Sequence, residues 1–384
     1  MAQIKLSIVC DYLEEKWYSM DLCAEMLIEN LHRAEDNEVA LERICPKFKP
    51  RLQNIPLLGK KNSFYNTDRL LNRFWDYPNY LKDNLRIDNF NFYHVVDHSY
   101  AQLVHVLPKQ RVGVYCHDID AFRSILKPAQ ESRPAWYRAI SGRILSGLQK
   151  SAIVFYSTEA VASEIKQHQL IDPACLIQAP LGISPEFNLL NYLDPGAEKI
   201  FRQIGNTPYI LHIGSCIPRK RIDVLLEVFS RLRKIYPELL LVKVGGQWTP
   251  EQFQQIEQNN LQQAIIHLYN LNRTTIAQLY RRSVAVLLTS EAEGFGLPVI
   301  EALACGTVVV ASDIPVLKEV GGNAILYCPP SQVETWTDLV SQLLVNPELA
   351  PPLALRLAQA DKYSWSRHAA IIQQSYLNLA DKAQ

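Results

Sequence analysis

The stretch from Thr289 to Gly306, TSEAEGFGLPVIEALACG, constrains the fold of this chain more than any other. It continues an apolar, β-branched run at 284–289, which is typical of a buried parallel strand. Pro298 falls where the first helical residue is expected, because a proline there loses no helical hydrogen bond. The stretch therefore predicts a strand, a glycine-bearing loop and a helix that stops near Gly306.

Two carboxylates bracket the start of this predicted helix. Glu293 lies in the loop, and Glu301 lies near the end of the first helical turn. Gly294 and Gly296 remove side chains between them, so a ligand has access to the backbone N–H groups of residues 295–297. Such amides at a helix N-terminus attract phosphate. Two acids beside a phosphate cradle suit a diphosphate with a sugar on each side, although glutamates eight apart also occur on solvated helix faces.

The segment EGFGLPVIEALACGTVVVASD, residues 293–313, resembles the signature of the family-4 retaining glycosyltransferases, which have the GT-B fold. The resemblance implies that Glu293 contacts the donor sugar and that Glu301 takes the ribose hydroxyls. It also implies that the amides of Phe295, Gly296 and Leu297 hold the distal phosphate. The expected fold class is α/β, with two Rossmann-like, doubly wound domains facing across a deep cleft.

The resemblance divides the chain near the segment APLGISPEF, whose prolines and glycine suit a crossing between domains. Residues 1–185 are expected to form an N-terminal, acceptor-binding domain, and residues 186–364 a nucleotide-sugar-binding domain. The last helix, about 365–384, is expected to cross back and pack on the first domain. In the second domain, strand-like and helix-like segments alternate, which indicates βαβ units and a parallel sheet.

The second domain opens with PYILHIGSCIPRKRIDVLLEV, in which a strand at 209–213 leads to a turn at Gly214. The following loop carries three adjacent cations, which suit a diphosphate: Arg219, Lys220 and Arg221. Members of the resembling family commonly have an arginine directly after this glycine and a lysine a few residues later. Lys220 matches that lysine, Ser215 stands where the arginine would be, and Arg219 is the alternative cation.

In the first domain, VGVYCHDIDAFR predicts a strand that ends at His117 and Asp118. The resemblance implies that His117 contacts the donor sugar, while a structural role for a lone histidine at a strand end stays open. Asp118 is expected to support the histidine or the loop. Residues 97–100 follow another strand and are expected on the ligand side of the sheet. His94 and His98 are four apart, but no glutamate follows His94, so no metal site is expected.

The N-terminal 90 residues carry the least information about function. The loop after the first strand has no glycine where many family members have one, so Asp11, Glu14 and Glu15 either face an acceptor or lie in a solvated loop. Residues 43–86 hold ten Lys or Arg and three Asp, interleaved with aromatic residues. This basic segment could contact an anionic membrane, contact an anionic acceptor, or be a solvated face balanced elsewhere.

Composition narrows the class of protein further. Lys and Arg number 39 against 39 Asp and Glu, which argues against a general nucleic-acid binder. The eight cysteines include no C-x-x-C pair, which indicates buried thiols in a reducing compartment. With no signal peptide and no apolar run near the roughly 18 residues of a spanning helix, a cytoplasmic protein is expected, with peripheral contact at the inner membrane face as an alternative.

The sequence therefore predicts a retaining hexosyltransferase. The donor would be a UDP-, GDP- or ADP-sugar, and the acceptor a hydroxyl of a glycan, a lipid or a small molecule. No cofactor and no metal are expected, because Lys220 and the amides of 295–297 suit the charge of the leaving diphosphate and because no D-x-D motif is recognised. The alternatives are a nucleotide-sugar-binding protein without catalysis and an epimerase of the same fold. A dehydrogenase is disfavoured because no G-x-G-x-x-G follows the first strand.

Overall fold

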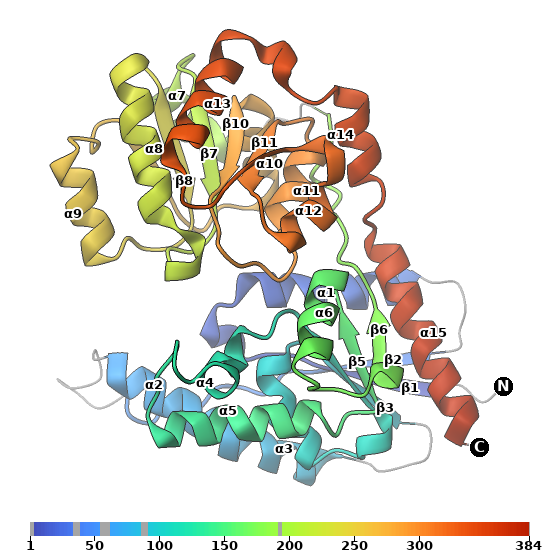
Figure 1. Cartoon of the computed structure of the whole chain (residues 1–384). Helices are drawn as coiled ribbons and strands as arrows, with labels where there is room; N and C mark the ends of the chain where they lie inside the picture. The colour runs from blue at the N-terminus through green and yellow to red at the C-terminus, as the bar shows by residue number, and fades with distance from the viewer. Residues whose placement is uncertain (1–3, 34–38, 54–61, 86–90, 191–193, 384) are drawn as a thin grey trace. The chain divides into compact units, whose positions relative to one another are not determined.

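The computed structural model describes residues 4–33, 39–53, 62–85, 91–190 and 194–383. The chain divides into two compact units (Figure 1). Unit 1 comprises Met1–Gly182 and Trp365–Gln384, and unit 2 comprises Ile183–Ser364.

Unit 1 is built on a parallel sheet of six strands in the order β2-β1-β3-β4-β5-β6. The strands are β1 Ile4–Val9, β2 Val39–Ile44, β3 Asn91–Val95, β4 Val112–Cys116, β5 Ile153–Tyr156 and β6 Leu176–Gln178. All residues of β3, β4 and β5 are buried, because helices cover both faces of the sheet. Strand β2 was not predicted from the sequence, since its polar residues hide the strand pattern.

The helices of unit 1 form two layers. They are α1 Tyr18–Arg33, α2 Asn62–Leu71, α3 Tyr77–Asn84, α4 Arg123–Leu126, α5 Ala135–Leu148, α6 Glu159–Gln167 and α15 Trp365–Ala383. On one face α15 packs against α1, and the buried Tyr376 hydroxyl donates to the carbonyl of Tyr93 at 2.9 Å. The C-terminal helix is thereby anchored to the central strands of unit 1.

Unit 2 repeats the architecture with a parallel sheet in the order β12-β11-β10-β7-β8-β9. The strands are β7 Tyr209–Ile213, β8 Leu240–Val244, β9 Ile265–Leu268, β10 Ala285–Leu288, β11 Val309–Ser312 and β12 Leu326–Cys328. The helices are α7 Glu198–Ile204, α8 Ile222–Ile235, α9 Pro250–Gln258, α10 Arg273–Arg282, α11 Leu297–Ala304, α12 Pro315–Gly321, α13 Val333–Val345 and α14 Leu353–Ala360.

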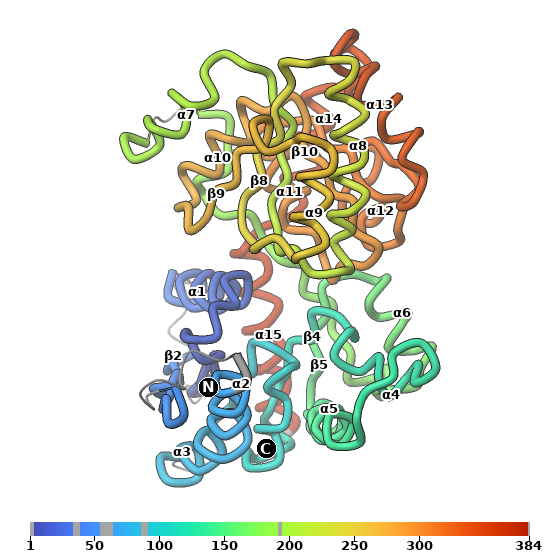
Figure 2. The backbone as a smooth tube through the Cα atoms, turned by 90° about the vertical axis from the view of Figure 1, so that its left-hand side faces the viewer, coloured from blue at the N-terminus to red at the C-terminus, as the bar shows by residue number. Residues whose placement is uncertain are grey.

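Two groups of helices sandwich the sheet of unit 2. Helix α8 packs with α9 and α13, whereas α11 packs with α10, α12 and α14, as the backbone trace allows the reader to follow (Figure 2). Two parallel, doubly wound α/β sheets confirm the fold class predicted from the sequence.

The strand order of unit 2 determines which loops lie at its topological switch point. In unit 2 the chain runs outward from β7 in one direction and from β10 in the other, so these neighbouring strands form a topological switch point. Ligands of doubly wound sheets bind at such a point, beyond the carboxyl ends of the strands. The loops in question are 214–221 after β7 and 289–296 after β10, which are the two loops with candidate donor-binding residues.

Helix α5 packs closely against the 3₁₀ helix η3, His98–His105, and a glycine substitution can test this packing. A Cβ on Gly147 would lie impossibly near the Ala101 carbonyl oxygen, which is backbone and has little freedom to shift. Gly147→Ala should lower the free energy of unfolding by about 2–3 kcal/mol through overpacking. Chemical denaturation followed by circular dichroism measures it.

Gly142 on the same helix provides the matched control. A Cβ there would have its nearest neighbour at 4.0 Å, so Gly142→Ala should be neutral or stabilising by up to about 1 kcal/mol through helix propensity. Equal destabilisation by both substitutions would contradict the packing of α5 against η3.

Candidate functional site

The loops after β7 and β10 meet through side chains and backbone. The Glu291 amide donates to the Arg219 carbonyl at 2.9 Å, and the Thr289 hydroxyl donates to the Lys220 carbonyl at 3.0 Å. Thr289 is fully buried at the end of β10. These bonds fix the cationic loop relative to the loop that carries Glu293.

The central contact of the site is an ion pair between Lys220 and Glu293. The Lys220 Nζ donates to Glu293 Oε1 at 2.5 Å, and the Ser290 hydroxyl donates to the same oxygen at 2.7 Å. The Glu293 side chain is only 6% exposed. Burial acts to raise the pKa of Glu293, but Lys220 and Arg219 outweigh burial and lower it, so the carboxylate is ionised at neutral pH.

The two cations beside Lys220 have different surroundings. Arg219 donates to the carbonyl of Ala292 at 2.9 Å and lies 3.5 Å from Glu293 Oε2, so it faces the same carboxylate as Lys220. Arg221 has a left-handed backbone (φ 47°) and pairs with Asp223 at 2.8 Å. Of the three cations predicted to suit a diphosphate, Arg219 and Lys220 converge on Glu293, whereas Arg221 is engaged at the start of α8.

The N-terminus of α11 presents open backbone amides. Gly296 caps the helix with φ 94°, and a Cβ at this position would lie 2.8 Å from the Leu317 side chain. No hydrogen bond from the amides of residues 295–297 is present within the described part of the chain. The Phe295 ring is buried and packs edge-on against Tyr363 at 5.4 Å, so it anchors the loop.

Glu301 lies one turn into α11. Its Oε2 accepts a hydrogen bond from the buried Tyr280 hydroxyl at 2.9 Å. Burial raises the pKa of Glu301 to about 7, although the Tyr280 hydroxyl acts in the opposite direction. The carboxylate is therefore poised to ionise when a ligand supplies further hydrogen-bond donors.

Gly214 and Ser215 form the turn at the carboxyl end of β7. The Gly214 amide donates to the Val244 carbonyl at 3.0 Å, and its carbonyl accepts from Lys243 Nζ at 2.6 Å. Ser215 is half-buried. Unit 2 thus gathers the predicted residues of this turn, the cationic loop and the α11 N-terminus around one switch point.

In unit 1, His117 lies directly after β4 and is buried. Its Nε2 is 2.8 Å from the Val96 carbonyl, and its backbone N–H donates to His98 Nδ1 at 3.3 Å. Burial lowers the pKa of His117, with Asp97 opposing this effect. The neutral ring donates from Nε2 to Val96, as assigned from this hydrogen bond, which leaves Nδ1 as an acceptor.

The expectation that the chain has no D-x-D motif is wrong, because Asp118 and Asp120 form such a triplet directly after His117. Asp118 Oδ1 accepts from the Asp120 amide at 3.0 Å, and Asp120 pairs with Arg123 at 2.8 Å. Both carboxylates are thereby used within the turn that starts the 3₁₀ helix Asp120–Phe122. Among the described residues, no group of three or more His, Cys, Asp or Glu has the arrangement of a metal site.

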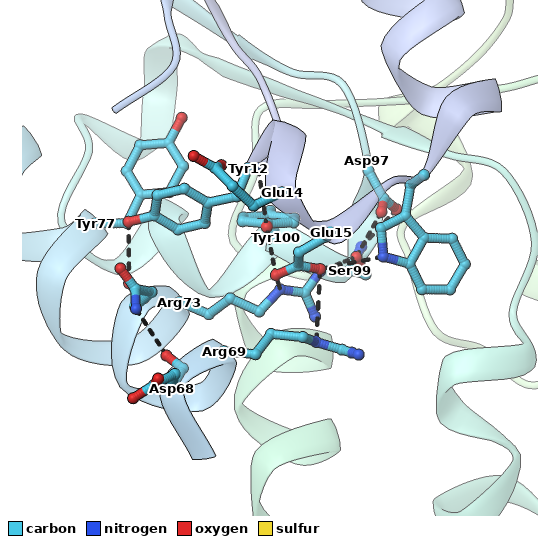
Figure 3. Close-up of polar contacts among 12 residues, drawn as sticks. Tyr12, Glu14, Glu15, Asp68, Arg69, Arg73, Tyr77, Asp97, Ser99 and Tyr100 are labelled. Carbon is cyan, nitrogen blue, oxygen red and sulfur yellow. Dashed lines mark hydrogen bonds and ion pairs between the residues drawn. The ribbon is translucent and has the colours of Figure 1, made fainter. Parts of the chain in front are cut away.

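The expectation that Asp11, Glu14 and Glu15 lie in a solvated loop is wrong for Asp11 and Glu15. Asp11 is 2% exposed, and the Glu15 side chain is fully buried. Glu15 pairs with Arg73 at 3.0 Å and accepts from the Tyr100 hydroxyl at 2.9 Å, as Figure 3 shows. Burial and the nearby Asp97 raise the pKa of Asp11 well above its ordinary value.

The same network accounts for part of the basic segment 43–86. Arg69 and Arg73 reach Glu15, and Lys49 and Arg51 pair with Asp76, which ends the π-helical turn Asn72–Asp76. Of the seven basic residues of this segment that the structure describes, four therefore form ion pairs within unit 1. Lys60, Lys61 and Arg86 lie outside the described residues.

Comparison with known proteins gives the family of part of the chain. Residues 197–360 match the family model described as Glycosyl transferases group 1. O-antigen chain mannosyltransferase B of Escherichia coli is 33% identical over 162 residues, which cover 41% of this chain and 42% of that protein. The serotype-specific mannosyltransferase WbdA of Escherichia coli is 26% identical over 254 residues, covering 62% of this chain and 30% of WbdA. This chain thus spans less than half the length of these relatives.

Solved structures show the same fold over nearly the whole chain. Sucrose-phosphate synthase from Thermosynechococcus elongatus has a TM-score of 0.76 at 17% identity, covering 98% of this chain and 99% of that chain. Anabaena HepE in complex with UDP and glucose has a TM-score of 0.71 at 15% identity, covering 97% and 99%. No helix within the described residues is long and apolar enough to cross a membrane.

The family match begins in the short helices before β7, ends in α14, and contains every loop of the unit 2 switch point. Glu293 and Glu301 come from the segment 293–313 on which the resemblance is based, whereas Gly214 and Lys220 come from the loop after β7. Residues 197–360 therefore belong to the group 1 glycosyl transferases.

Proposed function

We propose that the chain is a retaining glycosyltransferase that moves a hexose from a nucleotide-diphosphate sugar to an acceptor hydroxyl. The observation that carries the proposal is the Lys220–Glu293 pair beside the open amides of α11, at the switch point of a group 1 domain. Lys220 and the α11 amides are complementary to an anion, Glu293 to a sugar hydroxyl and Glu301 to a ribose.

In this proposal the diphosphate lies against Lys220 and the amides of residues 295–297. Binding replaces the contact between Lys220 and Glu293, so the lysine turns from a carboxylate to a phosphate oxygen. The released Glu293 carboxylate then accepts hydrogen bonds from hexose hydroxyls. Fixed cationic and amide donors of this kind stabilise charge that develops on a leaving group, which is an electrostatic form of catalysis.

In the transfer step, the bond between the anomeric carbon and the diphosphate oxygen breaks. The acceptor oxygen bonds to the same face of the carbon, and its proton passes to the departing diphosphate. Lys220 and the amides carry the charge of the leaving group, so we propose that no metal is required. Glu301 accepts the ribose hydroxyls, and the free Nδ1 of His117 accepts a hydroxyl of the donor sugar.

The relatives suggest which donor and acceptor to test first. Both reported relatives are named as mannosyltransferases, one of them of the O-antigen chain, and HepE was solved with UDP and glucose. Mannose and glucose donors carrying UDP, GDP or ADP are therefore the first set, with glycans as the first acceptors. We further propose a cytoplasmic location, with the basic segment 43–86 as the candidate for contact with an acceptor or a membrane surface.

The first experiment separates the two members of the central pair. Donors are screened with EDTA present, by calorimetry and by release of nucleotide with and without acceptor. Lys220→Met should weaken nucleoside diphosphate binding and lower kcat by about 100- to 1,000-fold, as expected for loss of a preorganised donor. Glu293→Gln should lower kcat by a similar factor yet bind the nucleoside diphosphate at least as tightly as wild type, because Lys220 is released.

Arg231→Met is the control, since Arg231 pairs with Glu334 on the exposed surface of the same unit and should leave activity unchanged. Absence of binding to every nucleotide sugar would contradict the proposal. Conversion of a donor to its epimer without acceptor would instead identify an epimerase, and binding without turnover a nucleotide-sugar-binding protein.

A second prediction follows from the pKa of Glu301, which burial raises to about 7. Ribose hydroxyls donate to the ionised carboxylate, so donor binding favours ionisation and affinity is lost as pH falls through 7. At pH 6 about one-tenth of the groups are ionised, so Kd for the nucleotide sugar should be up to about tenfold higher at pH 6 than at pH 8. The phosphates of a nucleotide sugar do not titrate in this range.

Glu301→Gln serves as the comparison for the pH series. The amide cannot ionise, so the variant should bind more weakly than wild type at pH 8 and should lose no affinity as the pH is lowered from 8 to 6. A wild-type Kd that stays constant over this range would rule out the role of Glu301.

A further inference from the structure

A charged side chain lies inside the sheet of unit 2, one strand away from the donor loops. Lys243 belongs to β8, the neighbour of β7 (Figure 1), and is 0% exposed. Its Nζ donates to the carbonyl oxygens of Gly214 at 2.6 Å, Gly245 at 2.5 Å and Val244 at 3.1 Å. An ammonium has three protons, so these bonds use its full donor capacity.

These three bonds tie two turns together. Gly245 and Gly246 are both left-handed, with φ of 78° and 61°, and a Cβ on Gly246 would lie 2.5 Å from the Cys216 amide nitrogen. The turn after β8 therefore packs directly on the turn after β7. The Gly245 carbonyl also lies 3.2 Å from His267 Nε2, on β9, so both of its lone pairs have a partner.

The charge of Lys243 has no carboxylate partner among the described residues. Burying a cation in this way is unfavourable unless another group compensates its charge. Neighbouring Lys220 adds a second positive charge, since a Cβ on Gly214 would lie 3.9 Å from Lys220 Cε. Gly214 thus lies between the two lysines. Arg219 and Lys220 both contact Glu293, so Lys243, Lys220 and Arg219 together exceed the charge of this one carboxylate by two.

An excess of two positive charges matches the diphosphate of a nucleotide sugar, which carries two negative charges. We propose that Lys243 is a positioning residue of the donor site: it holds the Gly214 and Gly245 turns in place, and the bound diphosphate compensates its buried charge. This inference rests on the proposed function, because the diphosphate is the donor's.

The other titratable groups around Lys243 come from β7, its loop and β9. Burial lowers the pKa of Lys243 to about 8, and Lys220 lowers it further while Cys216 opposes. His212, on β7, is buried with its pKa lowered, and within the described residues its Nε2 has no hydrogen-bond partner. Burial also lowers the pKa of His267 and raises that of Cys216, so both are neutral between pH 7 and 8. Lys243 is the group that loses its charge just above neutrality.

The test compares wild type with Lys243→Met, which removes the charge and keeps the length of the side chain. Thermal unfolding should show a folded variant, because replacing a buried charge by an apolar group is often tolerated. Calorimetry is then run with a nucleoside diphosphate and with the bare nucleoside. The expected result is a Kd about 10- to 100-fold higher for the diphosphate and an unchanged Kd for the nucleoside. Equal losses for both ligands, or no loss for either, would overturn the inference.

A pH series on wild type keeps the inference testable if the variant does not fold. Between pH 7 and pH 9 the Kd of the nucleotide sugar should rise for wild type, as Lys243 deprotonates. The Kd of Lys243→Met should not rise over this range, because the remaining titration, that of Glu301, favours binding as pH increases. A constant wild-type Kd over this range would overturn the role of Lys243. If wild type and Lys243→Met bind the nucleoside diphosphate equally well, only this inference is refuted. If wild type binds no nucleoside diphosphate, the proposed function is refuted as well.

Discussion

The ion pair between Lys220 and Glu293 holds together the two loops of the candidate site. Both side chains are largely buried, at 14% and 6% exposed, and they join the loops of two neighbouring strands. Removing one partner of a buried pair typically costs about 3–5 kcal/mol, because the other charge stays behind without compensation. A ligand that brings both an anion and hydroxyl groups can replace the contact on both sides at once. A diphosphate linked to a hexose has that chemistry.

The loops at the carboxyl ends of the strands differ between the two units in their charge and in their internal contacts. In unit 2 the loops carry an excess of positive charge and leave backbone amides open at α11. In unit 1 the loop after β1 is closed by an internal network, in which Arg73 and Tyr100 hold Glu15 (Figure 3). Asp11, in the same loop, interacts with Asp97. Part of the positive charge of the segment 43–86 is used in this network. The excess of positive charge beside open backbone amides is thus local to unit 2, although the chain as a whole has no net charge.

Much of unit 2 was predictable from the sequence, because strands, glycine turns and the proline of α11 each leave a local signal. The predicted strand at 209–213 and the loops around Lys220 and Glu293 lie where the pattern indicated. Lys243 was missed because it was read as one residue of an apolar strand. The lysine inside LLLVKVGG, just before two glycines, was the available signal. Asp11 and Glu15 were misjudged because their burial depends on Arg73 and Asp97, which are distant in sequence, and no local pattern reports such partners.

The most direct test of the central claim is a crystal structure of the chain with a bound nucleoside diphosphate. The account predicts that Lys220 Nζ leaves Glu293 and contacts a phosphate oxygen. It also predicts that the amides of residues 295–297 donate to the distal phosphate and that Glu301 accepts from the ribose. Phosphates bound elsewhere, with the Lys220–Glu293 contact intact, would contradict it.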